Sequence, residues 1–126
     1  MSGFAVGRHL IDAYGAGGFR FAGMSHVGSI LATPGGVYEV VALALADLRF
    51  EHFAPLMQEL ADKPGSTELL VVGTGENMAR LPAPLALRLK GAGLRLEAMA
   101  TGPASRVYNV LVSENRRVAA LLLAAP

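Results

Sequence analysis

The chain contains no cysteine, which excludes disulfides, thiolate nucleophiles and zinc sites built on cysteine. It has no tryptophan either, and only 6% of its 126 residues are aromatic. Charge is scarce as well: 11 basic and 10 acidic residues give a formal net charge of +1, with no block of like charge longer than Arg116-Arg117. This balance offers no electrostatic basis for binding nucleic acid, so we expect no nucleic acid among the partners.

Long apolar runs and targeting segments are also missing. No apolar stretch reaches the ~18 residues that a membrane-spanning helix needs. The first ten residues, MSGFAVGRHL, lack the charged and then apolar pattern of a signal peptide, and no arginine- and serine-rich mitochondrial presequence is present. The sequence therefore predicts a cytoplasmic protein without a membrane span.

What the chain does have is a high apolar content, with 52% hydrophobic residues against 17% charged ones. This composition is typical of a folded protein, and the length predicts a single domain over residues 1–126, with residues 1–8 flexible. Because soluble monomers seldom expose large apolar patches, the low charge also favours a protein partner or a homo-oligomer.

Motifs for metal binding or nucleophilic catalysis are absent from the sequence. His9, His26 and His52 stand far apart and belong to no HExxH pattern, so we expect no metal site. No Gly-x-Ser-x-Gly elbow exposes a serine beside Asp12 and His26. We expect no cofactor, and the sequence leaves open whether the protein is an enzyme.

The N-terminal third predicts two β-hairpins. Residues 9–14 and 19–22 flank Gly15-Ala16-Gly17-Gly18, and residues 27–32 and 37–41 flank Thr33-Pro34-Gly35-Gly36. In both cases the glycines permit the backbone angles that a tight reversal needs. This third of the chain should therefore form β structure.

Helices and strands alternate in the rest of the chain. Apolar residues at three- and four-residue intervals predict a helix after Asp47, whose regular part begins at residues 52–54 because Pro55 fits only a first turn. Strands are predicted over 67–72, 94–99 and 117–124, with helices starting at Pro84 and Thr101 between them. This order is typical of an α/β domain.

The last helix has one apolar face and one polar face. Ala104, Val107, Tyr108 and Leu111 should face the core, and Arg106, Asn109 and Ser113 should lie elsewhere. We expect Thr101 to cap this helix and Asn115 to end it in a left-handed conformation.

One set of residues is a candidate for binding a small anion. The turn Gly73-Thr74-Gly75 follows a strand, and its amides would bind an anion if the arginines of the last helix lay at the same sheet edge. The alternative is a plain turn, with solvated arginines that hold helix ends and loops through Glu76 and Glu114. The candidate ligand-binding residues are Gly73, Thr74, Gly75, Asn77, Arg80, Arg106, Asn109 and Arg116.

Four segments of the chain resemble one small family: residues 11–20, 73–75, 100–111 and 114–120. The most specific part is Tyr108-Asn109-Val110-Leu111 running into Glu114-Asn115-Arg116-Arg117-Val118-Ala119-Ala120. The chain is similar here to the α/β family that includes the mitochondrial complex I assembly factor 3 and the adipogenesis-associated domain protein, with many bacterial members. Three positions depart from this family: Ala16 replaces an expected acid, Ser105 a frequent cysteine, and Val107 a frequent threonine.

The resemblance implies a layered α/β fold with a mixed, largely parallel central sheet, helices and an additional N-terminal β layer. It also implies a non-enzymatic interaction or assembly-assisting protein, and it supplies no catalytic residues. The alternative hypothesis is a protein that binds a small anion or a nucleotide-like ligand, including an enzyme of unknown reaction. A role that depends on a thiol is excluded in this chain, because it has no cysteine.

Overall fold

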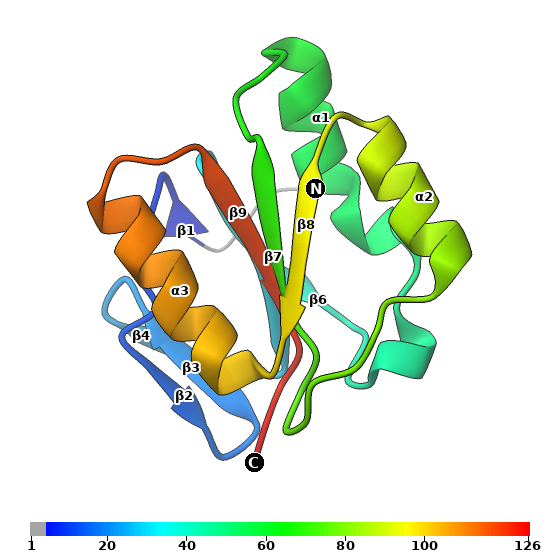
Figure 1. Cartoon of the computed structure of the whole chain (residues 1–126). Helices are drawn as coiled ribbons and strands as arrows, with labels where there is room; N and C mark the ends of the chain where they lie inside the picture. The colour runs from blue at the N-terminus through cyan, green and yellow to red at the C-terminus, as the bar shows by residue number, and fades with distance from the viewer. Residues whose placement is uncertain (1–4) are drawn as a thin grey trace.

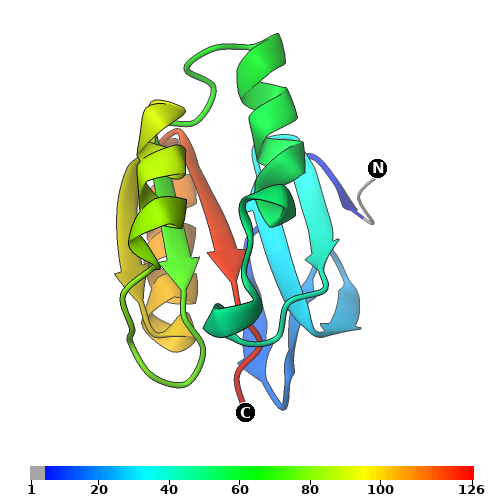
Figure 2. The same cartoon turned by 90° about the vertical axis from the view of Figure 1, so that its right-hand side faces the viewer.

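The computed structural model describes residues 5–126, which form two sheets and three α-helices (Figure 1). The central sheet has the strand order β1-β6-β5-β9-β7-β8, and a small sheet has the order β2-β3-β4. Helices α1 and α2 cover one face of the central sheet, and α3 and the small sheet cover the other (Figures 1 and 2). In chain order the elements are β1 (Ala5–Val6), β2 (Ala13–Gly15), β3 (Gly18–Phe21), β4 (Met24–Val27), β5 (Ser29–Thr33), β6 (Gly36–Val40), η1 (Leu45–Asp47), η2 (Phe50–Phe53), α1 (Ala54–Asp62), β7 (Leu69–Gly73), α2 (Ala83–Gly91), β8 (Arg95–Met99), α3 (Thr101–Ser113) and β9 (Val118–Leu122).

The central sheet is mixed, as the family resemblance implies, with two parallel and three antiparallel pairings between neighbouring strands. Strand β7 lies between β8 and β9 and is parallel to both, while β9 is antiparallel to β5, β5 to β6, and β6 to β1. Because parallel connections are right-handed, the step outward from β7 to β8 and the step back across β7 to β9 put their helices on opposite faces. This explains why α2 and α3 sandwich the parallel part of the sheet.

The small sheet forms the additional N-terminal β layer. The tight turn at Ala16-Gly17, with φ angles of 52° and 78°, joins β2 to β3 and confirms the first predicted hairpin. Strand β4 corrects the sequence prediction, which assigned Val27 to the next strand. A second tight turn at Ala22-Gly23, where both residues have positive φ angles, instead brings residues 24–27 alongside β3.

Each face of the central sheet buries its own apolar core. On one face, Leu70, Val72 and Leu121 pack with Leu56 of α1 and Leu89 of α2. On the other face the sheet packs against α3 and the small sheet through Ile30, Val71, Leu122, Ala104, Tyr108, Phe19 and Phe21. All five residues of β9 are buried, which agrees with the prediction of a fully buried last strand.

Helix boundaries follow proline and asparagine signals in the sequence. The 3-10 turn η2 leads directly into α1, and Pro55 lies in the first turn of α1 as expected. After α3, Asn115 has a φ of 60° and so ends the helix in the predicted left-handed conformation. Of the segment 1–8 that was expected to be flexible, residues 1–4 lie outside the described part, and Ala5–Val6 pair with β6.

Candidate functional site

The glycine turn after β7 lies directly against the start of α3. The amide of Gly75 donates to Oγ1 of Thr101 at 2.9 Å, and the amide of Thr101 donates to the carbonyl of Gly75 at 2.8 Å. A Cβ on Gly73 would lie 2.9 Å from Oγ1 of Thr101, so only glycine fits at this close approach. The turn and the last helix are therefore neighbours at the carboxyl end of the sheet, as the sequence hypothesis required.

Thr101 has a different role from the expected helix cap. Ala100 is the cap residue of α3, and its side chain makes no capping hydrogen bond. The buried hydroxyl of Thr101 instead donates to the carbonyl of Leu123 at 2.7 Å while it accepts from Gly75. One hydroxyl therefore joins α3, the glycine turn and the segment after β9. The local bond expected of Ser105 is present, from its hydroxyl to the carbonyl of Thr101 at 2.8 Å.

Several amides that would cradle an anion at this turn are already bonded. The amide of Thr74 donates to the carbonyl of Met99, and the amide of Ala79 donates to Oγ1 of Thr74. The hydroxyl of Thr74 in turn donates to the carbonyl of Asn77 at 2.7 Å. Asn77 contributes only its carbonyl to this network, and both Asn77 and Arg80 are exposed. The geometry is that of a tied-down turn, and a ligand role for these residues stays a prediction.

Tyr108 and Asn109 of α3 fasten the segment that precedes β2. The side chain of Asn109 accepts from the amide of Ile11 and donates to its carbonyl, both at 2.8 Å. The hydroxyl of Tyr108 donates to the carbonyl of His9 at 3.2 Å. Burial raises the pKa of Tyr108 to about 12, which keeps this hydroxyl protonated as a donor. The amide group of Asn109 thus serves the fold, with both its polar atoms engaged.

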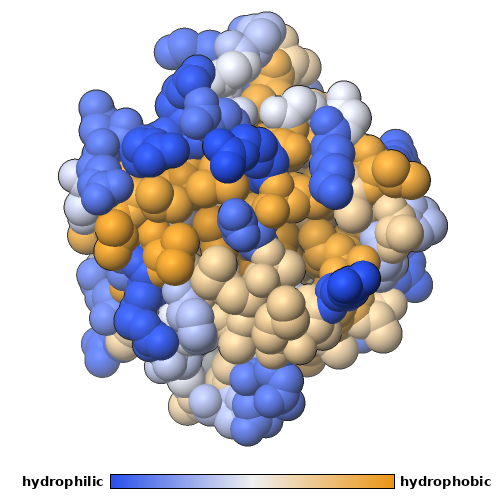
Figure 3. Space-filling view, in the orientation of Figure 1, coloured by the Kyte–Doolittle hydropathy of each residue, from blue (hydrophilic) through white to orange (hydrophobic). Residues whose placement is uncertain are grey.

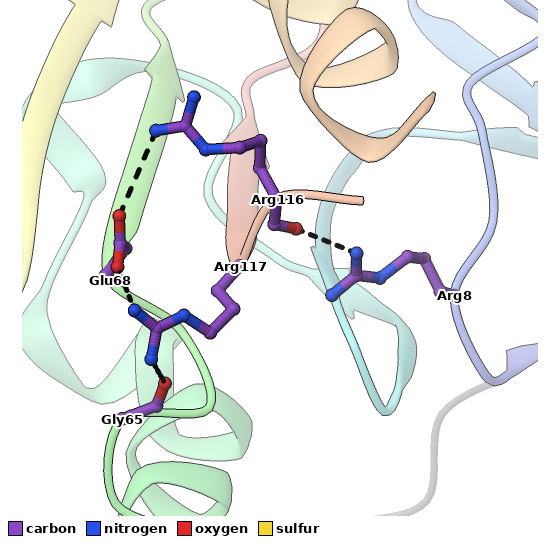
Figure 4. A network of polar contacts seen from close by, with 5 residues as sticks. All are labelled: Arg8, Gly65, Glu68, Arg116 and Arg117. Atoms are coloured by element: carbon purple, nitrogen blue, oxygen red, sulfur yellow. Dashed lines mark hydrogen bonds and ion pairs between the residues drawn. The ribbon is translucent and has the colours of Figure 1, made fainter. Parts of the chain in front are cut away.

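The arginine pair after α3 lies at the other end of the sheet (Figure 4). The guanidinium of Arg117 bonds to the carboxylate of Glu68 and to the carbonyl of Gly65, and that of Arg116 lies 3.9 Å from Glu68. Arg8 reaches across to donate to the carbonyl of Arg116 at 2.8 Å. These contacts fasten the N-terminal ends of β7 and β9 to each other and to the N-terminal segment.

The eight candidate residues therefore do not form one pocket, which corrects the convergence expected from the sequence. A helix of 13 residues separates the glycine turn from Arg116, and at 1.5 Å per residue this is about 20 Å. Gly73, Thr74, Gly75, Asn77 and Arg80 lie at the carboxyl end of the sheet, and Arg116 at the amino end. Arg106 is exposed on α3 between them.

A cleft of about 640 Å³ opens at the amino end, beside this arginine network. Three cations and two carboxylates line it, together with a hydroxyl: Arg8, Lys63, Arg117, Glu59, Asp62 and Ser66. Glu59 is engaged in the fold, because it accepts from the hydroxyl of Thr33 and from the amide of Gly35. The buried hydroxyl of Ser66 has no hydrogen-bond partner among residues 5–126. Sequence reasoning found only the Arg116-Arg117 pair, since Arg8 and Lys63 come from distant segments.

Three large apolar side chains are exposed at the carboxyl end of the sheet, in loops that also carry Glu76 and Arg80. Val41 and Leu43 follow β6 and are 77% and 63% exposed, and Met78 in the loop after β7 is 63% exposed. Both loops lie at the end of the molecule where the C terminus is drawn, in each of two perpendicular views (Figures 1 and 2). We call Val41, Leu43 and Met78 the apolar rim.

A family model for a protein of unknown function, DUF498/DUF598, matches residues 11–123. The chain belongs to this family. A relative from Rhodobacter capsulatus, an uncharacterised protein, is 41% identical over 98% of this chain and 90% of its own length. The NADH dehydrogenase [ubiquinone] 1 alpha subcomplex assembly factor 3 of Xenopus tropicalis is 30% identical over 90% of this chain, which spans 60% of that protein.

A crystal structure from Bartonella henselae, described as an outer membrane protein, has the same fold. It matches with a TM-score of 0.88 and 41% identity, over 97% of this chain and 99% of that one. Among residues 5–126 no helix is long and apolar enough to cross a membrane. The same residues contain no cluster of three histidine or carboxylate side chains that could hold a metal ion.

Proposed function

We propose that this protein assists the assembly of a larger protein complex by binding a protein partner, without catalysing a reaction. The relationship to assembly factor 3 of NADH dehydrogenase, over 90% of this chain, carries the proposal. By that similarity the partner is a subunit of a respiratory NADH dehydrogenase. The protein would act from the cytoplasmic side.

The apolar rim is the surface that suits such a partner. Large exposed apolar side chains lie there on loops, whereas the cleft at the opposite end of the sheet is lined by five charged side chains. Exposed apolar groups mark interaction sites because their burial by a partner is favourable. The loop with Met78 is held by the buried hydroxyl of Thr74, so little conformational freedom is lost when a partner binds.

Affinity purification of the tagged chain from its native organism, after cross-linking in cells, tests this proposal. We expect subunits of the NADH dehydrogenase to copurify with the wild type. The double variant Val41→Glu, Leu43→Glu should lose them, because it places charges on the apolar rim. The matched control is Val27→Glu, since Val27 is 82% exposed on β4, outside the apolar rim. Equal recovery of these subunits with all three proteins, or with none, would contradict the proposal.

A second candidate function is the binding of a small anion, and the cleft at the amino end favours it. Arg8, Lys63 and Arg117 converge on this cleft, where a carboxylate or phosphate would meet up to three cations. Among the candidate residues from the sequence, Arg116 alone borders this region, through its contacts with Glu68 and Arg8.

Thermal unfolding in the presence of inorganic phosphate and of small dicarboxylates tests the second function. A ligand that binds the folded state raises the midpoint, and Lys63→Ala should remove this rise without changing the midpoint of the free protein. Arg106→Ala is the control, because Arg106 is exposed on α3 away from the cleft. A rise that survives Lys63→Ala, or none with any anion, would argue against this function.

A further inference from the structure

Strand β8 is an open edge of the central sheet. Within the described residues it pairs only with β7, and in Figure 1 it is the sheet strand nearest the viewer. Figure 2 shows the same strand at one side of the sheet, with no further strand beyond it. An edge of this kind offers unpaired backbone groups to another strand.

The backbone pattern shows which groups point outward. The amide of Arg95 donates to the carbonyl of Glu68, and the carbonyl of Met99 accepts from the amide of Thr74, so these two residues point toward β7. Because direction alternates along a strand, Leu96 and Ala98 turn their amides and carbonyls away from β7. These outward groups require a partner strand, or water, to be satisfied.

Two residues of β8 that point their backbone groups toward β7 carry side chains of opposite charge. Arg95 and Glu97 are both exposed and lie on the same face of β8, two residues apart. Neither Arg95 nor Glu97 belongs to an apolar core, whereas Leu96 packs against the core beneath α2. The edge therefore carries one cation and one anion next to each other.

Helices α2 and α3 contact β8 from opposite faces of the sheet, and each exposes a large apolar side chain, Leu87 at 70% and Val110 at 53%. Figure 3 views this edge and shows orange apolar side chains from α3 across to α2, interrupted by blue charged ones. Such a mixed surface fits a partner with matching charges.

We propose that β8 pairs with β8 of a second copy of this chain, antiparallel and with Leu96 opposite Leu96. A twofold axis through this point extends the two sheets into one. Leu96 and Ala98 then supply the outward hydrogen-bonding groups. Arg95 of each copy lies opposite Glu97 of the other, in the non-hydrogen-bonded pairs where side chains approach closest.

Charge selects this register among those that the backbone permits. Only registers that place outward-pointing residues opposite each other can form the ladder, so the pairing can shift only in steps that keep this match. A shift in one direction puts Arg95 opposite Arg95, and a shift in the other puts Glu97 opposite Glu97. Like charges directly opposite are destabilising, whereas the proposed register has two opposite-charge pairs. The edge is thus self-complementary in only one arrangement.

Sedimentation of the whole chain over a concentration series tests the association. We expect a species of twice 13.1 kDa. Glu97→Arg places arginines opposite each other twice by symmetry and should weaken dimerisation about tenfold or more. Arg95→Glu with Glu97→Arg restores both opposite-charge pairs and should restore dimerisation. A monomer at every concentration, or a double variant as weak as the single one, would overturn the proposal.

The absence of cysteine allows the register to be read directly. A mixture of the Arg95→Cys and Glu97→Cys variants should form an oxidised dimer, which joins positions 95 and 97 and retains one ion pair at the other side of the axis. Each variant oxidised alone should stay largely uncross-linked. Cross-linking of Glu97→Cys alone would show the shifted register instead. This surface differs from the apolar rim, so loss of dimerisation and loss of the proposed assembly function are separately visible.

Discussion

At the carboxyl end of the central sheet, buried hydroxyl groups hold the loops, whereas at the amino end exposed arginines hold them. Thr101 joins the glycine turn to the segment after β9 through a hydroxyl that water does not reach. At the other end Arg117 and Glu68 meet in solvent. Removing a buried hydrogen-bonding group costs the full desolvation of its partners, but exposed ion pairs contribute little. The loops at the carboxyl end are therefore the fixed ones, whereas the arginines at the amino end can exchange their hydrogen-bond partners.

The largest effect should come from Thr101→Val, which keeps the branched shape and removes the hydroxyl. The amide of Gly75 and the carbonyl of Leu123 lose this partner, so we expect the free energy of unfolding to fall by about 3 kcal/mol. Urea denaturation measures it. Ser113→Ala, at the exposed end of the same helix, is the control and should stay within about 0.5 kcal/mol of wild type. If the two variants unfolded alike, the carboxyl end would not be the fixed one.

The buried Tyr108 in the middle of α3 should make the protein less stable in alkaline solution. The pKa of Tyr108 rises from 10.0 in the unfolded chain to about 12 in the folded one because of burial. Between these values the unfolded chain releases a proton that the folded protein keeps. The contribution of Tyr108 to the free energy of unfolding is therefore fully present below pH 10 and falls by about 2 kcal/mol by pH 12. Unfolding in urea at a series of pH values measures this loss.

Tyr108→Phe is the matched control for that titration. It removes the ionising group and keeps the ring in the core, so the fall in stability above pH 10 should be smaller by the contribution of Tyr108. It also removes the hydrogen bond to the carbonyl of His9, which lowers stability at neutral pH by about 1 kcal/mol. An unchanged pH profile would mean that Tyr108 titrates normally and is reached by water.

The smallest effect is expected at the amino end. Arg117→Gln removes the ion pair with Glu68, and we expect the free energy of unfolding to change by only about 0.5 kcal/mol. This small difference should vanish in concentrated salt, because exposed charges are screened. Parallel denaturation of Glu68→Gln should give the same result. A loss as large as that of Thr101→Val would remove the contrast between the two ends.

Most of the element pattern could be predicted from the sequence, because periodicity and turn residues act locally. Pro55 marked the start of α1, Asn115 the end of α3, and the apolar run after Arg117 became the buried strand β9. Strand β4 was missed because its four residues, Met24–Val27, lack a buried face, with exposed or half-buried side chains throughout. Its only local signal was the turn at Ala22-Gly23.

The candidate site was harder to predict, because it depends on which end of the sheet each segment reaches. Sequence reasoning grouped Gly73 with Arg116, but a helix that connects parallel strands must return to the opposite end of the sheet before the next strand starts. Arg116 precedes β9, so it lies where β7 begins and not where β7 ends. The same rule places Glu68 beside Arg117, and that contact could have been inferred from the predicted parallel pairing.

The position of β9 constrains when the central sheet can form during synthesis of the chain. It is the last strand along the chain, yet it lies between the parallel strand β7 and the antiparallel strand β5. While the ribosome is still translating α3, the part of the sheet that contains β5 and the part that contains β7 share no backbone hydrogen bonds, and their apolar faces remain open to water. Closure of the sheet must follow release of this late segment from the exit tunnel, and until then the exposed apolar faces favour aggregation.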